Sequence, residues 1–190
     1  TYDDIRKAVE HKAGIDSISL RQKGLDGITS HMLRFLENHD EQRFASRFFT
    51  GNALRCGPAM VLTTCMHSGP NMIYFGQESG VKAEGAEGFG GDDGRTTMFD
   101  YWGVPEHQAF INGGKYDEGK YIEEQKQVHE FYRKLLNLNL TSDALQHGRF
   151  YDLQSSHLDY NKNDCYSFLR YTNKQRLLII VNFSNDKTYT

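Results

Sequence analysis

The stretch from Arg34 to Arg43, which reads RFLENHDEQR, decides the fold of this chain. The apolar pair Phe35-Leu36 is followed at once by polar residues that include Asn38-His39-Asp40. A buried strand looks like this when it ends at a site, because ligands bind at the carboxyl ends of strands in parallel α/β folds. An imidazole beside a carboxylate can bind a polyol and stabilise developing positive charge. A turn with a helix cap fits the same residues, and the triplet alone leaves both interpretations open.

A second stretch, Gly69 to Glu78, reads GPNMIYFGQE and places another short apolar run before polar residues. Phe35 to Asp40 resembles the seventh-strand motif of the α-amylase family, glycoside hydrolase family 13. Gly69 to Glu78 resembles the eighth-strand motif of the same family. Two such motifs in the right order are much more specific than either alone.

The resemblance implies an α/β fold, the C-terminal part of a (β/α)8 TIM barrel followed by the first strands of an antiparallel β-sandwich domain. Residues 1–145 would run from the sixth to the eighth barrel helix, and residues 146–190 would be an incomplete β-sandwich domain. His31–Leu36 and Met72–Phe75 would be the two barrel strands.

The residues themselves predict the helices. Thr1–Gly14 reads as a short capped helix, whereas the glycines of Ile15–Ser30 indicate a loop or a broken helix. Pro58 fits the first turn of an apolar helix that continues to Cys65. Tyr121–Leu138 has apolar residues on one face and charged residues on the other, which is typical of an amphipathic helix.

Three strand-like runs follow, and polar residues separate them. They are Gly148–Leu153, Tyr166–Thr172 and Leu177–Phe183. The chain has three cysteines and no CxxC pair, which argues against a disulfide framework and predicts free, buried thiols.

The resemblance assigns roles near the first motif. Asp40 would be the family's third carboxylate, which holds the hydroxyls of the cleaved sugar and favours its oxocarbenium-like form. His39 would hydrogen-bond the same sugar, and Asn38 would support that binding site from behind. Arg43 would reach sugar hydroxyls, or would be an exposed arginine paired with Glu41 or Asp40. Trp102, the only tryptophan, would be a stacking platform or a packed loop anchor.

Other residues would support the site. Gln77 and Glu78 would shape its floor, and Arg95 would border the sugar groove. Asp92 and Asp93 suit either a calcium site or a solvated turn, and the turn is favoured because their spacing is not that of an EF-hand. We therefore expect no metal and no cofactor in this chain, while calcium is compatible with the missing part of the parent protein.

Two functional carboxylates of the family have no counterpart here. A retaining glycosidase needs a nucleophile and an acid/base about 5–5.5 Å apart, and the fourth-strand pattern Gly-x-Arg-x-Asp is absent from this sequence. The parent is expected to act on α-linked glucans such as starch and maltooligosaccharides by retaining double displacement. The isolated chain is expected to be an inactive fragment that self-associates through its exposed half-barrel.

Composition excludes several other classes. A net charge of −3 over 190 residues favours neither nucleic-acid binding nor an acidic disordered tail. No apolar run approaches the roughly 20 residues of a membrane span, and no signal peptide is visible. We expect no nucleic-acid or membrane partner, and the compartment, secreted, periplasmic or cytoplasmic, stays open.

Two alternative functions remain. A non-catalytic amylase-like scaffold, as in the heavy chains of amino-acid transporters, has no need of an intact Asn38-His39-Asp40. A carbohydrate-binding module does not usually carry barrel-strand motifs. Linkage specificity, and hydrolysis as opposed to glucosyl transfer, depend on parts of the family's fold outside this chain.

Overall fold

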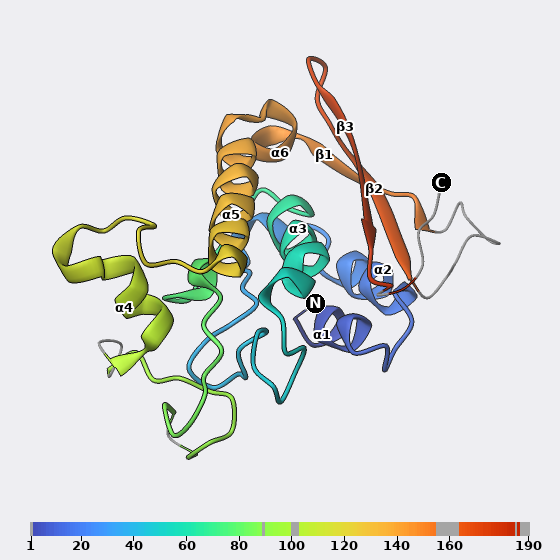
Figure 1. The fold of residues 1–190 in the computed structure, drawn as a ribbon. Coiled ribbons are helices and arrows are strands. Elements are labelled where there is room, and N and C mark those ends of the chain that lie inside the picture. The colour runs from blue at the N-terminus through green and yellow to red at the C-terminus, as the bar shows by residue number, and fades with distance from the viewer. Residues whose placement is uncertain (1, 89, 100–102, 155–163, 185, 187–190) are drawn as a thin grey trace. The chain divides into compact units, whose positions relative to one another are not determined.

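The computed structural model describes residues 2–88, 90–99, 103–154, 164–184 and 186 of the chain (Figure 1). Its helices and strands follow one another in the order α1 (Tyr2–Val9), α2 (Asp16–Gly24), η1 (Thr29–His31), η2 (Ala53–Cys56), α3 (Gly57–Cys65), η3 (Gln77–Ser79), α4 (Pro105–Ile111), η5 (Asn112–Gly114), α5 (Glu123–Thr141), α6 (Asp143–His147), β1 (Arg149–Asp152), β2 (Cys165–Tyr171) and β3 (Arg176–Asn182), where η marks a 3-10 helix.

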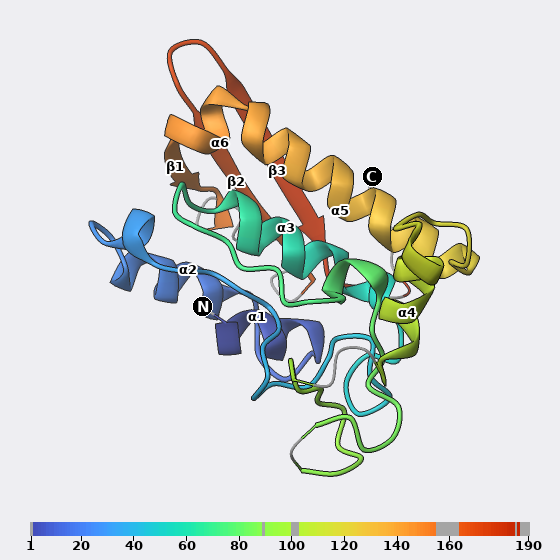
Figure 2. The ribbon, with the colours of Figure 1, turned by 90° about the vertical axis from the view of Figure 1, so that its left-hand side faces the viewer.

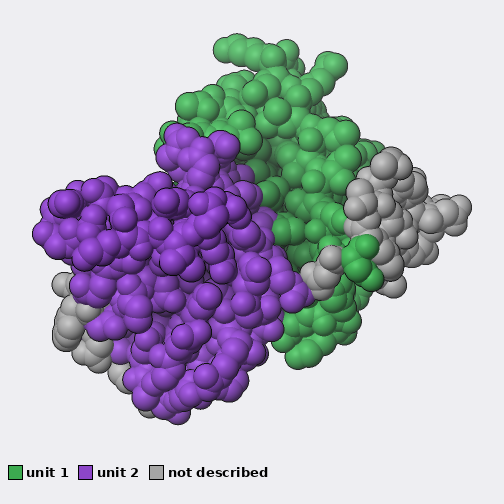
Figure 3. All heavy atoms as spheres, in the orientation of Figure 1, with its two compact units in different colours: residues 1–34, 58–71, 136–190 green, residues 35–57, 72–135 purple. Residues whose placement is uncertain are grey.

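The chain divides into two compact units (Figure 3). The first unit consists of residues 1–34, 58–71 and 136–190, and the second of residues 35–57 and 72–135. Each unit therefore gathers segments that are distant in the sequence. The boundary predicted between residues 145 and 146 separates the barrel from the β-sandwich domain, and it does not correspond to the division into these two units. It stays a prediction.

The first unit contains a three-stranded antiparallel sheet with the order β1-β2-β3 (Figures 1 and 2). Tyr151 of β1 lies opposite Leu169 of β2, which lies opposite Leu178 of β3. Side chains alternate between the two faces along β2, and Tyr166 and Phe168 are fully buried. The three strand-like runs of the sequence thus form the predicted antiparallel strands, each within a few residues of its expected bounds.

Two helical predictions agree with the structure, whereas the helix expected over Thr1–Gly14 is the shorter α1, which ends at Val9. The apolar helix that begins beside Pro58 is α3, and the amphipathic helix is α5, which continues to Thr141. The ambiguous stretch after Gly14 contains α2 and then Gly27, whose φ of +82° interrupts helical geometry. Within the described residues, no helix is both long and apolar enough to span a membrane.

The barrel strands are much shorter than expected. Instead of strands over His31–Leu36 and Met72–Phe75, the structure has one isolated parallel bridge between Arg34 and Asn71. The Arg34 N–H donates to the carbonyl of Pro70 at 3.0 Å. Parallel pairing is slightly less stable per residue than antiparallel pairing, and parallel strands are normally held in a sheet that is covered on both faces. Within the described residues this pair has no further parallel neighbour, which accounts for its single bridge.

A buried arginine joins β2 to the ends of two helices in the first unit. Arg170, only 1% exposed, donates from Nη1 to the carbonyl of Cys65 at 3.0 Å and from Nη2 to the carbonyls of Leu145 and Gly148, both at 2.9 Å. Nη2 also reaches the Ser68 hydroxyl at 2.6 Å. Cys65 ends α3 and Leu145 lies in the last turn of α6, where carbonyls lack intrahelical donors and a cation is favoured.

A buried histidine stabilises the turn that leads to the Asn71 bridge. His67 is 3% exposed, and its Nδ1 accepts the N–H of Gly69 at 2.9 Å. Its Nε2 lies 2.8 Å from the carbonyl of Thr63 and 3.2 Å from Oδ1 of Asn71. Burial, reinforced by the positive charge of Arg34, lowers the pKa of His67 to about 4. The folded chain therefore holds this imidazole neutral.

Replacing Arg170 tests the first of these anchors. Arg170→Met is expected to lower the free energy of unfolding by about 2–4 kcal/mol. Each of three buried carbonyls loses its hydrogen-bond donor, which costs about 1–3 kcal/mol per carbonyl. Removal of a buried charge offsets part of this loss. Urea unfolding gives the value. Arg176→Met, at the exposed start of β3, is the matched control and should change it by less than about 0.5 kcal/mol. Equal effects of the two variants would contradict the role of Arg170.

Acid titration tests the second anchor. His67 has a pKa of about 4 in the folded chain against an ordinary value of 6.5, so the unfolded state binds more protons between these pH values. Stability from His67 is complete above pH 6.5 and is lost as the pH falls toward 4, by on the order of 2 kcal/mol. The free energy of unfolding, measured with urea at pH 7.5 and pH 4.5, should differ less between the two pH values in His67→Gln than in the unmodified chain. His31→Gln, at an exposed position, should leave it unchanged, and an unaltered decrease in His67→Gln would refute the assignment.

Candidate active site

The Asn38-His39-Asp40 triplet lies in a loop of the second unit, directly after the buried Leu36. The Asn38 side chain folds back on the loop, and its Oδ1 accepts the N–H groups of Asp40 and Glu41, both at 2.9 Å. This turn is a typical one for asparagine. It fixes the backbone of the triplet and leaves the next two side chains free to point outward.

His39 and Asp40 form the exposed part of the loop. Their side chains are 49% and 76% exposed, and Nε2 of His39 lies 3.4 Å from Oδ2 of Asp40. A neighbouring imidazole and carboxylate that both face solvent can accept and donate hydrogen bonds to the hydroxyls of a sugar. This is the arrangement expected for these two residues, and their contact with a substrate stays a prediction.

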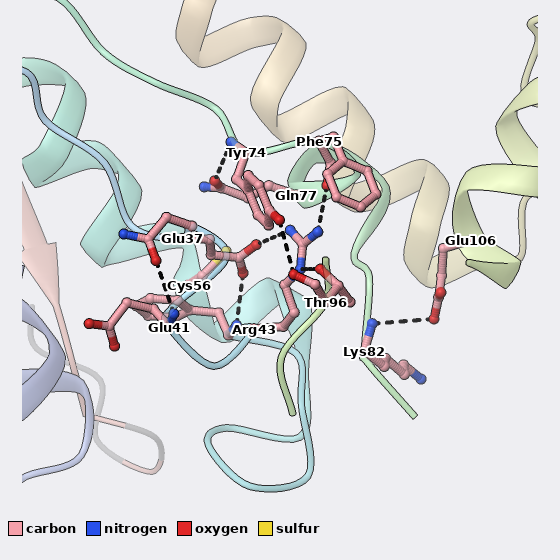
Figure 4. Close-up of polar contacts among 12 residues, drawn as sticks. Glu37, Glu41, Arg43, Cys56, Tyr74, Phe75, Gln77, Lys82, Thr96 and Glu106 are labelled. Carbon is pink, nitrogen blue, oxygen red and sulfur yellow. Dashed lines mark hydrogen bonds and ion pairs between the residues drawn. The ribbon is translucent and has the colours of Figure 1, made fainter. Parts of the chain in front are cut away.

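Arg43 lies beneath the loop and is fully buried. Figure 4 shows its guanidinium pointing toward Glu37 and Thr96. Nη1 donates to Glu37 Oε2 at 2.7 Å, Nε donates to Thr96 Oγ1 at 2.8 Å and Nη2 donates to the carbonyl of Phe75 at 2.7 Å. The guanidinium also lies over the rings of Tyr74 and Phe75, at 4.2 and 4.9 Å from their centroids. With its donors directed at protein groups, Arg43 supports the site from below rather than reaching sugar hydroxyls.

Buried contacts also stabilise the segment that carries the second motif. Gly76 has a φ of +74°, and a Cβ at this position would lie 2.4 Å from Val81 Cγ2, so only glycine fits. Gln77 is 4% exposed, and its Oε1 accepts the Tyr74 N–H at 3.2 Å while its Nε2 donates to the Tyr132 hydroxyl at 2.7 Å. Gln77 is therefore held inside this turn by protein groups, and its predicted role in shaping the floor of a sugar site stays a prediction.

Glu78 lies on another side of this turn. It is half-buried, and its charge adds to the effect of burial in raising the pKa of Tyr121. The Tyr121 hydroxyl is hydrogen-bonded to Ser79 at 2.5 Å. Within the described residues, the charge of Glu78 therefore acts on Tyr121.

A loop from the glycine-rich segment packs along the triplet. Arg95 Nε donates to the carbonyl of Asp40 at 2.6 Å, and Asp93 holds the same guanidinium through Nη1 at 2.8 Å. The Arg43 N–H donates to the carbonyl of Gly94 at 2.7 Å. Gly94 has a φ of +82°, and a Cβ there would lie 2.4 Å from Ser46 Oγ. Arg95 thus contacts the triplet through the backbone of Asp40, and its predicted place beside a sugar groove stays a prediction.

The two neighbouring aspartates do not form a metal site in this arrangement. Asp92 forms an ion pair with Arg47, and Asp93 forms one with Arg95. Over the part of the chain that the structure describes, no group of three or more histidine, cysteine, aspartate or glutamate side chains is arranged to hold a metal ion. The expectation of no metal and no cofactor stays a prediction.

Two residues complete the account of the site. Trp102, predicted as a stacking platform, lies outside the described residues. Glu37 was missed by the sequence interpretation, although it is 3% exposed and accepts hydrogen bonds from both Arg43 and the N–H of Phe44. A carboxylate directly after an apolar pair, with an arginine six residues later, is present in the sequence, but this pattern does not show which segments bury the two side chains.

The sequence matches a known family over most of its length. Residues 7–148 match the profile of the family described as alpha amylase, catalytic domain. An oligo-1,6-glucosidase of Halalkalibacterium halodurans is 27% identical over 221 aligned residues, which cover 93% of this chain and 38% of that protein. The chain therefore spans well under half of the length of this relative.

Solved structures show the same fold at low sequence identity. The structure of AmyP in complex with maltose has a TM-score of 0.65 and 18% identity, and the match covers 96% of this chain and 39% of that one. The gamma-CGTase from alkalophilic Bacillus clarkii has a TM-score of 0.63 and 17% identity, with coverage of 96% and 23%. These neighbours have the fold expected from the resemblance, part of a TIM barrel followed by antiparallel strands. Since the family match covers far more than half of the sequence, the chain belongs to the α-amylase family, to whose catalytic domain residues 7–148 correspond.

Proposed function

We propose that this chain is part of an α-amylase-family glycoside hydrolase that acts on α-linked glucans by a retaining double-displacement mechanism. The observation that supports this most is the pair His39 and Asp40. Both side chains are exposed on a loop whose backbone is fixed by Asn38 and Arg95. The family to which the chain belongs supplies the chemistry that such a pair would serve.

In this proposal Asp40 is the transition-state stabiliser. Its carboxylate accepts hydrogen bonds from hydroxyls of the sugar at the cleaved bond and favours the positively charged, oxocarbenium-like form. His39 donates a hydrogen bond to the same sugar. Both residues bind and orient the substrate, and neither transfers the glycosyl group.

The names of relatives support glucans as the substrate class. One relative is an oligo-1,6-glucosidase, and AmyP structures contain maltose and, in the E221Q variant, maltotriose. We propose starch and maltooligosaccharides as substrates of the whole protein. Maltotriose and isomaltose are therefore the two probes that represent the α-1,4 and α-1,6 linkages.

The chain alone is proposed to be inactive. Retention of configuration requires a nucleophile and an acid/base about 5–5.5 Å apart, and the sequence lacks the Gly-x-Arg-x-Asp pattern that carries the nucleophile in the family. Asp40 and His39 would therefore bind sugar here without cleaving it.

Binding and turnover can be measured on the same sample. The purified chain is expected to release no reducing sugar from starch or maltotriose, because binding groups alone supply no nucleophile. Titration with maltotriose or isomaltose, followed by amide NMR shifts, should perturb His39 and Asp40. Asp40→Ala should weaken the apparent affinity by about tenfold, as expected for loss of a charged hydrogen-bond acceptor worth about 1.5–3 kcal/mol.

The control for this titration is Asp186→Ala, which removes an exposed carboxylate of the first unit and should leave the affinity unchanged. Clear hydrolysis of starch by the chain would contradict its proposed inactivity. Absence of any sugar-induced shift at His39 and Asp40 would instead favour the scaffold alternative.

Self-association is proposed as a consequence of exposed apolar side chains. Leu20 and Leu33 are 75% and 50% exposed, and Leu178 and Ile180 on one face of β3 are 59% and 63% exposed. Surfaces of this kind favour association. Multi-angle light scattering should therefore show dimers or larger species, and Leu178→Lys with Ile180→Lys should shift the distribution toward monomer. A monodisperse monomer for the unmodified chain would rule the proposal out.

A further inference from the structure

Glu37 closes the loop that carries the triplet. Its Oε1 accepts the N–H of Phe44 at 2.7 Å, and its Oε2 accepts Nη1 of Arg43, also at 2.7 Å. One carboxylate at the start of the loop therefore holds two groups at its end. The segment between them, residues 38–42, contains all three residues of the triplet.

Two sets of hydrogen bonds thus act on this loop, one inside the other. The outer set is the pair of contacts made by Glu37, and the inner set is the pair of N–H groups bound by Asn38. The outer contacts fix the separation of the loop ends, which removes most of the freedom that a surface loop would have. The inner contacts then determine the direction in which His39 and Asp40 leave the backbone.

The charges at the base of the loop balance each other. Glu37 and Arg43 are 3% and 0% exposed, and their ion pair is shielded from water. The remaining Arg43 donors bind the Phe75 carbonyl and the Thr96 hydroxyl. The ends of the loop are thereby attached to the turn of the second motif and to the loop that carries Arg95.

We propose that Glu37 is a positioning residue, which sets the geometry of Asp40 and His39 without touching the sugar. The proposal rests on the function proposed above for these two residues. Burial of Glu37 leaves no surface for a ligand, so its effect passes through the backbone of residues 38–42. A charged pair that is satisfied on all sides rigidifies its surroundings, and this rigidity preorganises the binding groups.

The first test is the isosteric change Glu37→Gln. Glutamine offers one acceptor where glutamate offers two, so either Phe44 or Arg43 loses its partner. Amide order parameters from NMR relaxation at His39, Asp40 and Glu41 are expected to be about 0.85 in the unmodified chain and below about 0.6 in the variant. The apparent affinity for maltotriose should fall by about tenfold.

A double variant separates positioning from stability. Glu37→Gln leaves a buried, unpaired guanidinium, whereas adding Arg43→Met removes that charge and should restore much of the lost resistance to urea. The loop ends stay unattached in the double variant, so its order parameters should remain low. Order parameters near 0.85 in either variant, or low values in the unmodified chain, would overturn the proposal.

The matched control is Val128→Ala, a cavity-forming change in α5 of the same unit at a side chain that is 1% exposed. It should lower resistance to urea and leave the order parameters of the loop unchanged. A loop that becomes mobile in this control as well would show that its order follows overall stability, which would also overturn the proposal.

The two arms of the experiment distinguish the two proposals. If maltotriose causes no shifts at His39 and Asp40 of the unmodified chain, the proposed sugar-binding function fails. The order parameters still decide whether Glu37 positions the loop. If maltotriose binds and Glu37→Gln leaves both affinity and order unchanged, the positioning role alone fails.

Discussion

The second unit depends on one buried guanidinium. Arg43 is bound by the carboxylate of Glu37, the hydroxyl of Thr96 and the carbonyl of Phe75, so a single side chain joins three segments that are far apart in the sequence. Burying a charge is expensive unless it is paired and hydrogen-bonded. These partners satisfy Arg43 only when the three segments are arranged as they are here. In any other arrangement the buried charge would lack partners, so those arrangements are higher in free energy.

The first unit uses the same principle with different partners. Arg170 is surrounded by three backbone carbonyls and the Ser68 hydroxyl. Burial lowers the pKa of Arg170 to about 10, so the guanidinium stays charged at neutral pH. Carbonyls at helix ends carry partial negative charge, which lets an arginine be buried beside them at modest cost. Each unit therefore has a buried cation that connects segments distant in the sequence.

Much of the secondary structure could be predicted from the residues alone. The helix beginning beside Pro58 and the three C-terminal strands carried clear patterns, since an apolar run with a proline start suits a helix and short strand-like runs between polar residues suit strands. The barrel strands were the exception. An apolar run such as Met72–Phe75 shows that a segment can be buried in a sheet, but pairing needs neighbours, and Arg34–Asn71 is the only parallel bridge in the described residues.

The candidate site, too, was predictable only in part. The motif located His39 and Asp40, because residue types and their order are visible in a sequence. The burial of Arg43 and the role of Glu37 were not visible, since they depend on which segments meet below the loop. An arginine near the Asn38-His39-Asp40 triplet looks the same in the sequence whether its side chain faces solvent or is buried beneath the loop.

Two of these anchors act on the main chain. Arg43 donates to the carbonyl of Phe75 and also lies over its ring, and Arg95 donates to the carbonyl of Asp40. A main-chain acceptor is present whatever amino acid occupies the position. Substitution of Asp40 therefore leaves the acceptor for Arg95 in place. The contact by which Arg95 holds this loop is thus independent of the side chain that the loop exposes at position 40.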